Sequence, residues 1–197
     1  MAVAALVRDR SLDEHQTRRA RLWDLINTRS LQRGDFVLSS GEKSKYFFDM
    51  KATMLDPEGA NLIAELILAQ PEVAQADAIG GLEMGAVPLV SVVCALSLAT
   101  KPIPAFFVRK KQKEHGTKAL IEGNLKDRQR VVLVDDVTTF GNSVFKAIHA
   151  VQERRCTVTA VITVVDRMQG AEAKLAKAGI RLIPLFTRRD FEDGSTA

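Results

Sequence analysis

The sequence predicts a single α/β domain in which helices flank a mostly parallel sheet. Its 197 residues, 46% of them hydrophobic and 26% charged, are typical of one globular core and not of a disordered or fibrous chain. From residue 76 onward, short runs of continuous apolar residues alternate with segments of helical periodicity. Apolar runs of this kind are typical of strands buried on both faces, as in a parallel sheet covered by helices. We therefore expect one domain over residues 1–197.

The first 55 residues predict a small cap on this sheet. Leu22, Trp23, Leu25 and Ile26 share one helical face and indicate a short packing helix. Segment 34–50 contains two apolar stretches separated by small and polar residues, which predicts a hairpin or a pair of extended segments.

The elements that follow alternate regularly. Asp56 and Pro57 are typical of a helix start, with the aspartate as cap and the proline in the first turn. The remaining expected strands span 76–80, 103–108, 131–136, 158–166 and 180–186, and the remaining expected helices span 88–99, 143–153 and 171–178. We see no linker or internal repeat that would divide the domain.

Composition excludes several classes of protein. No apolar run approaches the roughly 18 residues of a membrane span, and the apolar start of the chain is interrupted at Arg8 before a signal-like core develops. We therefore expect a cytoplasmic protein with no membrane partner. Cys94 and Cys156 lie far apart, with no cluster of cysteine and histidine, so neither a disulfide framework nor a zinc site is expected and both thiols should be buried.

Residues 109–124 interrupt the alternation with a long polar segment, RKKQKEHGTKALIEGN. Its five basic residues and two acidic ones give it most of the chain's net charge of +4. Loops of this length inside a compact domain are uncommon, and they are usually functional or disordered. The sequence predicts a mobile basic loop here.

The most informative stretch is residues 131–143, VVLVDDVTTFGNS. A buried strand ends in Asp135 and Asp136, and a loop of hydroxyl and small residues leads directly into a helix. At the carboxyl end of a parallel strand, the free amides and hydroxyls of residues 138–143 can hold a phosphate, while the two carboxylates can accept hydrogen bonds from sugar hydroxyls. Phosphate plus ribose is the implied ligand. The alternative is that the two aspartates only end a strand and cap a turn.

Other phosphate motifs are missing. The chain contains no GxxxxGK[ST], and GGLEMG lacks the GxGxxG spacing, which disfavours P-loop nucleotidases and dinucleotide dehydrogenases. Gly80, Gly81 and Gly85 still lie between a predicted strand and a predicted helix. They could form a second backbone nest for diphosphate oxygens or only a tight turn.

Several segments in this order resemble a known family. VLVDDVTTFGNS is similar to the phosphoribosyl diphosphate (PRPP) signature of the type I phosphoribosyltransferases. The wider resemblance, over nearly the whole chain after about residue 30, is to the orotate phosphoribosyltransferase family. LSSGEKSKYFFDM resembles that family's substrate segment, GLEMGAVPL its diphosphate loop, VRKKQKEHGTKALIEG its mobile catalytic loop, and VVDRMQG the strand end that holds an orotate-binding arginine.

The resemblance implies an activity and its partners. The expected reaction transfers the 5-phosphoribosyl group of PRPP to orotate, giving orotidine 5′-monophosphate and diphosphate in pyrimidine biosynthesis. Mg²⁺ would be held mainly through the substrate and not by protein ligands. The expected assembly is a homodimer in which part of loop 109–124 reaches the neighbouring active site. No nucleic-acid partner is expected.

Residue roles follow from the same resemblance. The implied PRPP contacts are Arg109, Lys110, Lys113, His115, Asp135, Asp136, Val137, Thr138, Thr139, Phe140, Gly141, Asn142 and Ser143, of which Arg109, Lys113, His115 and Asp136 would be catalytic. The implied orotate contacts are Thr139, Arg167, Phe47 and Phe48. Other interpretations stay open, because the two phenylalanines could be core aromatics, Arg167 an exposed strand-end charge and His115 a solvated loop residue.

Four positions depart from the family pattern. Ser39 and Gly85 stand where some members have lysine, Phe140 where a small residue is usual, and Asn142 where glycine is common. Asn142 can adopt a positive φ if the loop requires it. Two rival functions remain at this stage: a purine or uracil phosphoribosyltransferase, and a noncatalytic regulator that binds PRPP or a nucleotide and then RNA.

Overall fold

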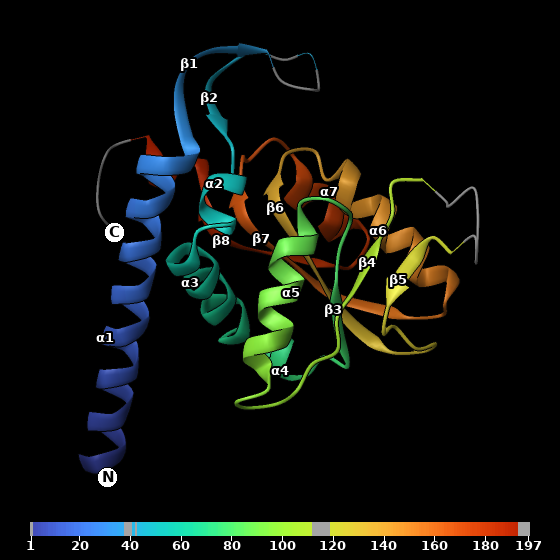
Figure 1. Ribbon diagram of the computed structural model, residues 1–197, viewed down its shortest axis with the longest axis horizontal. Helices are drawn as coiled ribbons and strands as arrows, with labels where there is room; N and C mark the ends of the chain where they lie inside the picture. The colour runs from blue at the N-terminus through green and yellow to red at the C-terminus, as the bar shows by residue number, and fades with distance from the viewer. Residues whose placement is uncertain (1, 38–40, 42, 112–118, 193–197) are drawn as a thin grey trace.

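The computed structural model describes residues 2–37, 41, 43–111 and 119–192, with side chains from residue 13 onward. Its centre is a four-stranded parallel sheet in the order β3-β6-β7-β8. These strands are β3 (Ala78–Gly80), β6 (Arg130–Thr138), β7 (Thr157–Asp166) and β8 (Arg181–Thr187). Helices cover both faces of the sheet (Figure 1), so the predicted fold class is confirmed.

Strands β4 (Phe106–Val108) and β5 (Ile121–Gly123) form an antiparallel pair beside this sheet. Two backbone hydrogen bonds connect the segment of β4 to β3 and the residue that follows it. The Ile79 amide donates to the Pro104 carbonyl at 3.1 Å, and the Val108 amide donates to the Gly81 carbonyl at 2.8 Å. The far end of segment 109–124 therefore forms a strand that the sequence did not predict, and the mobility of the segment stays a prediction. Ile121 pairs with Val108, so backbone pairing with β4 fixes that end of the segment.

The N-terminal cap contains a longer helix than the sequence predicts. Helix α1 spans Ala2–Leu25 and continues as one π-helical turn, η1 (Ile26–Ser30). An antiparallel hairpin follows, as predicted, made of β1 (Leu31–Val37) and β2 (Lys43–Phe48). Figure 1 shows the hairpin projecting from the body of the domain above α2 (Lys51–Met54).

The remaining helices connect the strands. They are α3 (Pro57–Leu68), α4 (Pro71–Ala74), α5 (Ala86–Ser97), α6 (Asn142–Glu153), α7 (Ala171–Lys177) and the 3₁₀ turn η2 (Arg188–Phe191). None of the helices in the described part of the chain combines the length and the apolar character needed to cross a membrane. Cys156 is buried and Cys94 is half-buried, and both are free thiols.

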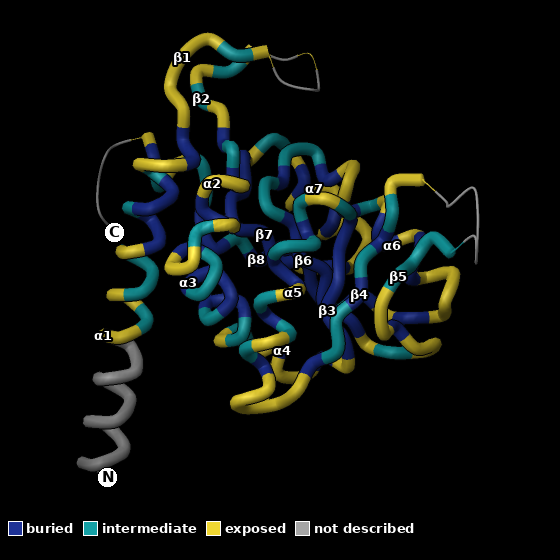
Figure 2. The backbone as a smooth tube through the Cα atoms, viewed as in Figure 1, coloured by how far each residue is buried: buried dark blue, intermediate teal, exposed yellow. Residues whose placement is uncertain are grey.

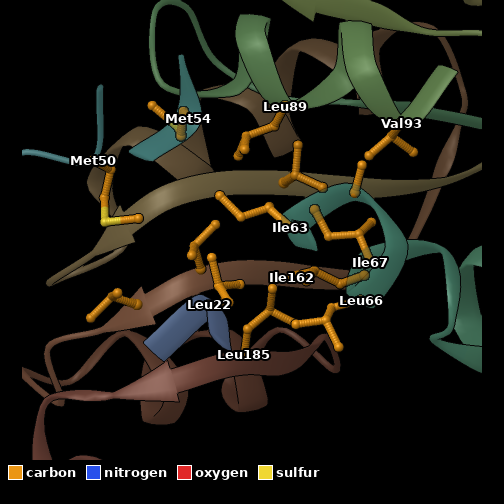
Figure 3. Close-up of a cluster of buried hydrophobic side chains, with 14 of the residues drawn as sticks. Leu22, Met50, Met54, Ile63, Leu66, Ile67, Leu89, Val93, Ile162 and Leu185 are labelled. Atoms are coloured by element: carbon orange, nitrogen blue, oxygen red, sulfur yellow. The ribbon is translucent and has the colours of Figure 1, made fainter. Parts of the chain in front are cut away.

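Alternate side chains of the same strands serve two hydrophobic cores. On β6, Val132 and Val134 contribute to the core beneath α1, α3 and α5, whereas Val131 and Leu133 contribute to the core beneath α6 and α7. Figure 3 shows the first core, in which side chains from the helices meet those of the sheet. Both faces are covered, which explains why these strands are continuous apolar runs (Figure 2).

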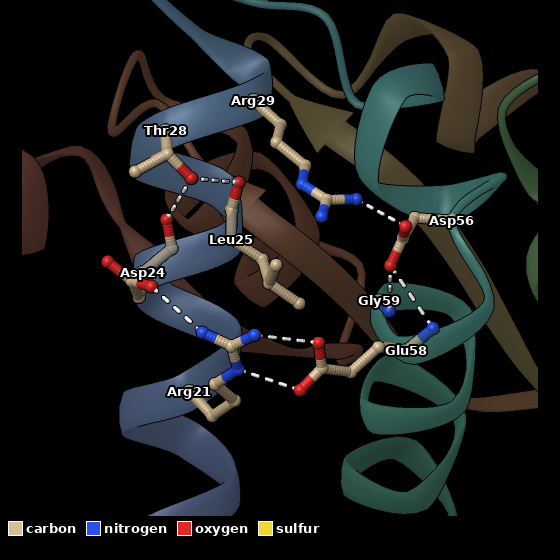
Figure 4. A network of polar contacts seen from close by, with 8 residues as sticks. All are labelled: Arg21, Asp24, Leu25, Thr28, Arg29, Asp56, Glu58 and Gly59. Atoms are coloured by element: carbon tan, nitrogen blue, oxygen red, sulfur yellow. Dashed lines mark hydrogen bonds and ion pairs between the residues drawn. The ribbon is translucent and has the colours of Figure 1, made fainter.

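Polar contacts fix α1 against α3 (Figure 4). The Asp56 carboxylate caps α3, as predicted, accepting from the amides of Glu58 at 3.1 Å and Gly59 at 3.0 Å. Arg29 also pairs with Asp56, and Arg21 donates two hydrogen bonds to the Glu58 carboxylate at 2.7 and 2.8 Å. Exposed ion pairs contribute little stability individually. Their effect here is to orient the helix from which the hairpin leads.

Candidate active site

The acid pair and its loop lie at the carboxyl end of β6, as the sequence predicts. Gly141 adopts φ +74°, and α6 begins at Asn142, one residue earlier than expected. The left-handed conformation therefore falls on Gly141, whereas Asn142 is helical and its side-chain oxygen accepts a hydrogen bond from Lys174 at 3.0 Å. Residues of this loop line a cavity of about 160 Å³: Asp135, Val137, Thr139, Phe140, Gly141, Asn142 and Ser143.

The two carboxylates occupy different environments. Asp135 is only 7% exposed, and its carboxylate accepts a bond from the Thr138 hydroxyl at 3.5 Å. Asp136 is half-buried and accepts from the Val137 amide at 2.9 Å. Burial raises the pKa of Asp135 well above its ordinary value, and the neighbouring charge of Asp136 raises it further. Two adjacent carboxylates in a cavity suit a ligand that brings hydroxyl donors or a cation.

A second cavity of about 350 Å³ adjoins the first. Its walls come from α2, the β3–α5 loop, the start of the basic segment and β6, and its lining residues are Lys51, Met54, Leu55, Leu82, Glu83, Met84, Gly85, Pro88, Lys110, Asp135, Asp136, Val137 and Ser143. Asp135, Val137 and Ser143 line both cavities. The arrangement suits an elongated ligand with anionic groups on either side of a hydroxylated centre.

The glycine-containing loop after β3 packs closely on β6. A Cβ added at Gly81 would lie 2.2 Å from the Val134 carbonyl oxygen, and one added at Gly85 would lie 2.4 Å from Oδ1 of Asp136. The peptide bond between Glu83 and Met84 in this loop is cis. Gly85 therefore brings backbone, without a side chain, against the acid pair.

Hydrogen bonds join this loop to the start of the basic segment. The Glu83 amide donates to the Val108 carbonyl at 2.8 Å, and the Glu83 carboxylate accepts from the Lys110 amide at 2.8 Å. Arg109 lies 3.9 Å from the Glu122 carboxylate. Lys110 lines the larger cavity, while Lys113 and His115 lie outside the described residues.

Arg167, at the end of β7, is 6% exposed, so the alternative of an exposed strand-end charge is wrong. Its backbone amide donates to the Thr138 carbonyl at 2.9 Å, which places it beside the phosphate loop and close to Thr139. Its Nη2 donates to the Ser44 hydroxyl at 2.7 Å and to the Tyr46 carbonyl at 3.3 Å. The hairpin thus reaches back to the sheet at this arginine.

The two adjacent phenylalanines lie on opposite faces of β2. Phe48 is 7% exposed and meets the Phe191 ring edge-on at 5.4 Å, as expected of a core aromatic. Phe47 is 39% exposed, with its ring 5.6 Å from that of Phe36. Strand alternation explains the difference. The exposed ring available for a ligand is that of Phe47, and the contact of either ring with a base stays a prediction.

Sequence reasoning missed Lys51 and Glu83. Lys51 follows the hairpin in a four-residue helix, lines the larger cavity and pairs with the Asp49 carboxylate. Glu83 lies within the GGLEMG turn, where the sequence analysis considered only the glycines. Glu83 also lies in GLEMGAVPL, the segment that resembles a diphosphate loop, but neither residue was given a role, and only the folded chain brings them to the acid pair.

This fold, with its acid pair and phosphate-sized cavity, is that of a phosphoribosyltransferase, and the family model of the phosphoribosyl transferase domain matches residues 53–185. The chain is 50% identical over 178 residues to an orotate phosphoribosyltransferase of Rhodopseudomonas palustris (strain BisB5), covering 88% of this chain and 95% of that protein. It is 42% identical over 159 residues to the enzyme of that name in Methanocaldococcus jannaschii, covering 81% and 88%.

Solved structures agree with these relatives. The orotate phosphoribosyltransferase of Mycobacterium tuberculosis H37Rv in complex with PRPP superposes with a TM-score of 0.73 at 33% identity, covering 88% of this chain and 98% of that one. The same enzyme in complex with Fe(III) dicitrate gives a TM-score of 0.77 at 35% identity, covering 89% and 99%. The chain belongs to the orotate phosphoribosyltransferase family, which confirms the resemblance seen in the sequence.

Proposed function

We propose that this protein transfers the 5-phosphoribosyl group of PRPP to orotate, giving orotidine 5′-monophosphate and diphosphate. The observation that carries the proposal is the pair of adjoining cavities that share Asp135. A phosphate cradle lies on one side of this carboxylate and a chamber with two lysines on the other, matching the order phosphate, ribose, diphosphate in PRPP.

In this proposal, the β6–α6 loop holds the phosphoribosyl half. The 5-phosphate occupies the cavity lined by Thr139 to Ser143, where free amides and the amino end of α6 favour an anion. The side chain of Phe140 does not prevent this, because backbone groups do the binding. Asp135 and Asp136 accept hydrogen bonds from the ribose hydroxyls.

The diphosphate occupies the larger cavity. Lys110 and Lys51 supply positive charge from its walls, and the close packing of Gly85 against Asp136 lets backbone approach the ligand. Arg109, Lys113 and His115 complete the set of groups expected to stabilise the departing diphosphate. The last two belong to residues 112–118, so their part stays a prediction.

Mg²⁺ would be held mainly through the oxygens of PRPP itself, with the acid pair close to it. Asp135 and Asp136 present adjacent carboxylates to the cavity, and their mutual repulsion is part of what raises the pKa of Asp135. Mg²⁺ prefers such oxygen ligands and keeps much of its shell for substrate oxygens. When bound with PRPP, it would neutralise charge on the diphosphate.

The base would bind at Arg167. Orotate carries a carboxylate, and a guanidinium can donate two parallel hydrogen bonds to it, whereas uracil offers no such group. The Arg167 amide donates to the Thr138 carbonyl, and Thr139 is the next residue of the loop. This backbone bond places the proposed base position beside the proposed phosphate cradle. Phe47 offers an exposed ring on strand β2 of the hairpin.

Little acid–base machinery is needed for this reaction. The base supplies a ring nitrogen acidic enough to act as the nucleophile, and the sugar carbon gains positive character as the diphosphate leaves. Water could intercept that carbon, so a closed site matters. The basic segment would cover the larger cavity from Lys110 onward, and in the expected homodimer part of it would reach the neighbouring site. That assembly and the cytoplasmic location stay predictions.

One assay separates this proposal from its rivals. Protein, Mg²⁺ and PRPP are mixed with orotate, uracil, adenine or hypoxanthine separately, and loss of each base is followed. We expect orotate alone to be consumed, and only when both PRPP and Mg²⁺ are present. Turnover of a purine or uracil without orotate activity would reassign the substrate. PRPP binding without consumption of any base would favour the regulator.

A further inference from the structure

The hairpin contacts Arg167 through two hydrogen bonds that join distant parts of the sequence. Strand β2 belongs to the projecting cap, yet Ser44 and Tyr46 lie against an arginine separated from Ser44 by 123 positions in the sequence. Arg167 is buried, and one terminal nitrogen, Nη2, makes both bonds to this strand, at 2.7 Å to the Ser44 hydroxyl and 3.3 Å to the Tyr46 carbonyl. The shorter of the two bonds is to the side chain.

The hydroxyl of Ser44 is used to its full capacity. It donates its hydrogen to the Tyr46 carbonyl at 2.8 Å and accepts from the Tyr46 amide at 3.1 Å. A hydroxyl offers one donor and two acceptor positions, and an arginine can only donate. The bond from Arg167 therefore takes the second acceptor position, and its direction is unambiguous. The surrounding backbone holds the oxygen that Arg167 meets.

The geometry of the hairpin places this oxygen. The register of β1 and β2 shifts between the pairs Arg33–Tyr46 and Phe36–Ser44, which marks a bulge. Bulges redirect side chains locally. The extra residue lies on β1, opposite the stretch of β2 from Ser44 to Tyr46. On β2 the local bonds between Ser44 and Tyr46 hold the hydroxyl and the Tyr46 carbonyl where both accept from Arg167.

We propose that Ser44 is a positioning residue for base recognition, holding the Arg167 guanidinium in the orientation in which its other donors meet the orotate carboxylate. The proposal rests on the function assigned above to Arg167. Bidentate pairing of a guanidinium with a carboxylate depends on the plane of the guanidinium, so fixing one terminal nitrogen fixes the approach of the ligand. The hairpin thereby contributes to specificity through Arg167.

A purely structural role predicts a different result. If the contact only attached the hairpin to the body, its loss would disturb the whole cap, including Lys51 and the larger cavity, and would affect PRPP and turnover as well. A positioning role acts on the base alone. The KM for orotate should therefore change while kcat and PRPP affinity do not.

The test compares Ser44→Ala with Ser44→Thr, which restores a hydroxyl and suits a strand. The matched control is Ser91→Ala, because Ser91 donates to the Val87 carbonyl of its own helix and, among the described residues, is not part of the lining of either cavity. For each variant, kcat and both KM values are measured, with PRPP affinity by calorimetry and Tm by calorimetric scan.

We expect Ser44→Ala to raise the KM for orotate by about tenfold, the scale of one hydrogen bond to a charged group, with kcat and PRPP affinity within about twofold of wild type. Ser44→Thr should recover most of the loss, and Ser91→Ala should resemble wild type. An unchanged KM for orotate, a parallel loss of PRPP affinity, or no recovery with threonine would overturn the proposal. A wild-type protein that consumes no orotate would instead refute the proposed function itself.

Discussion

The two parts of the proposed site, a phosphate half at residues 135–143 and a base half at Arg167 and the hairpin, are built in opposite ways. The phosphate half is one continuous stretch, from Asp135 to Ser143, at the end of a central strand. The base half joins Arg167, which directly follows β7, to Ser44 and Tyr46 on the cap, far apart in the sequence. One is local and follows from a strand, a turn and a helix start. The other exists only once the cap has docked.

Because of this difference, the two halves should tolerate different substitutions. In the proposed phosphate half the expected donors are backbone amides, and the loop turns at Gly141 with φ +74°, so side chains such as Phe140 and Asn142 can depart from the usual pattern without removing those donors. The base half depends on individual side chains and their orientation. Changes there should alter which base is used, whereas changes at the acid pair should alter PRPP binding for every base.

The largest expected effect is at Arg167. Replacing it with alanine leaves the orotate carboxylate without its partner in a buried position, which costs on the order of 2 to 5 kcal/mol in binding or transition-state stabilisation. We expect orotate turnover to be nearly lost while PRPP affinity, measured by calorimetry, stays close to wild type.

Arg167→Lys and Arg189→Ala are the controls for this variant. Lysine keeps the charge but cannot form two parallel hydrogen bonds, so it should restore activity only in part. Arg189 is exposed on η2, and its removal should change neither measurement. Parallel loss of orotate turnover and PRPP affinity in Arg167→Ala would mean that the two halves are not separable at this residue.

A smaller effect is expected on the PRPP side at Gly85. A Cβ there would lie 2.4 Å from Oδ1 and 2.8 Å from Cγ of Asp136, so the carboxylate must move or the loop must shift. Overpacking of this kind costs about 1–3 kcal/mol. Gly85→Ala should therefore weaken PRPP binding by about tenfold or more.

The matched variant is Gly34→Ala, whose added Cβ would meet only the Phe36 ring at 3.4 Å. It should bind PRPP as wild type does. If Gly85→Ala kept wild-type PRPP affinity but raised the KM for orotate, Gly85 would belong to the base half of the site and not to the PRPP half.

The same contrast explains what the sequence could and could not predict. Continuous apolar runs predicted the strands because both faces of the sheet are covered, and Asp56 with Pro57 predicted the start of α3 because capping is local. The acid pair at a strand end and the loop that leads into α6 were predicted for the same reason, whereas their roles toward a ligand stay predictions. The short strand Ile121–Gly123 was missed, because its pairing with β4 depends on a long-range contact and not on apolar periodicity.

Long-range contacts also determine where the residues lie whose position the sequence left open or whose place in the site it did not indicate. Nothing local distinguishes Phe47 from Phe48, and docking of the hairpin on Phe191 places Phe48 in the core. Lys51 and Glu83 line a cavity that residues of α2, the β3–α5 loop and β6 enclose together. The positions of Lys113 and His115 fall outside the described residues and stay predictions.

The smallest expected effect is on the stability of the folded protein, which the buried carboxylate of Asp135 lowers. Measuring this stability with and without PRPP separates a role of Asp135 in binding from a role in folding. Burial first, and the charge of Asp136 second, raise the pKa of Asp135 above its unfolded value. Between the ordinary carboxyl pKa and this raised value, the folded protein binds more protons than the unfolded chain, so stability falls as pH rises through that window. Above it the full cost of the ionised carboxylate is present. Asp135→Asn removes this cost.

We therefore expect Asp135→Asn to have a higher Tm than wild type at pH 8 without ligand, by about 2–4 °C for each kcal/mol recovered, and to lose the advantage as the pH is lowered toward the ordinary carboxyl range. PRPP should stabilise the variant much less than wild type, because one acceptor for the ribose hydroxyls has lost its charge. Glu153→Gln, an exposed change of the same type at the end of α6, should leave both measurements unchanged. A lower Tm for Asp135→Asn at every pH would show that this carboxylate supports the fold, and that the phosphate half of the site carries no stability cost at this position.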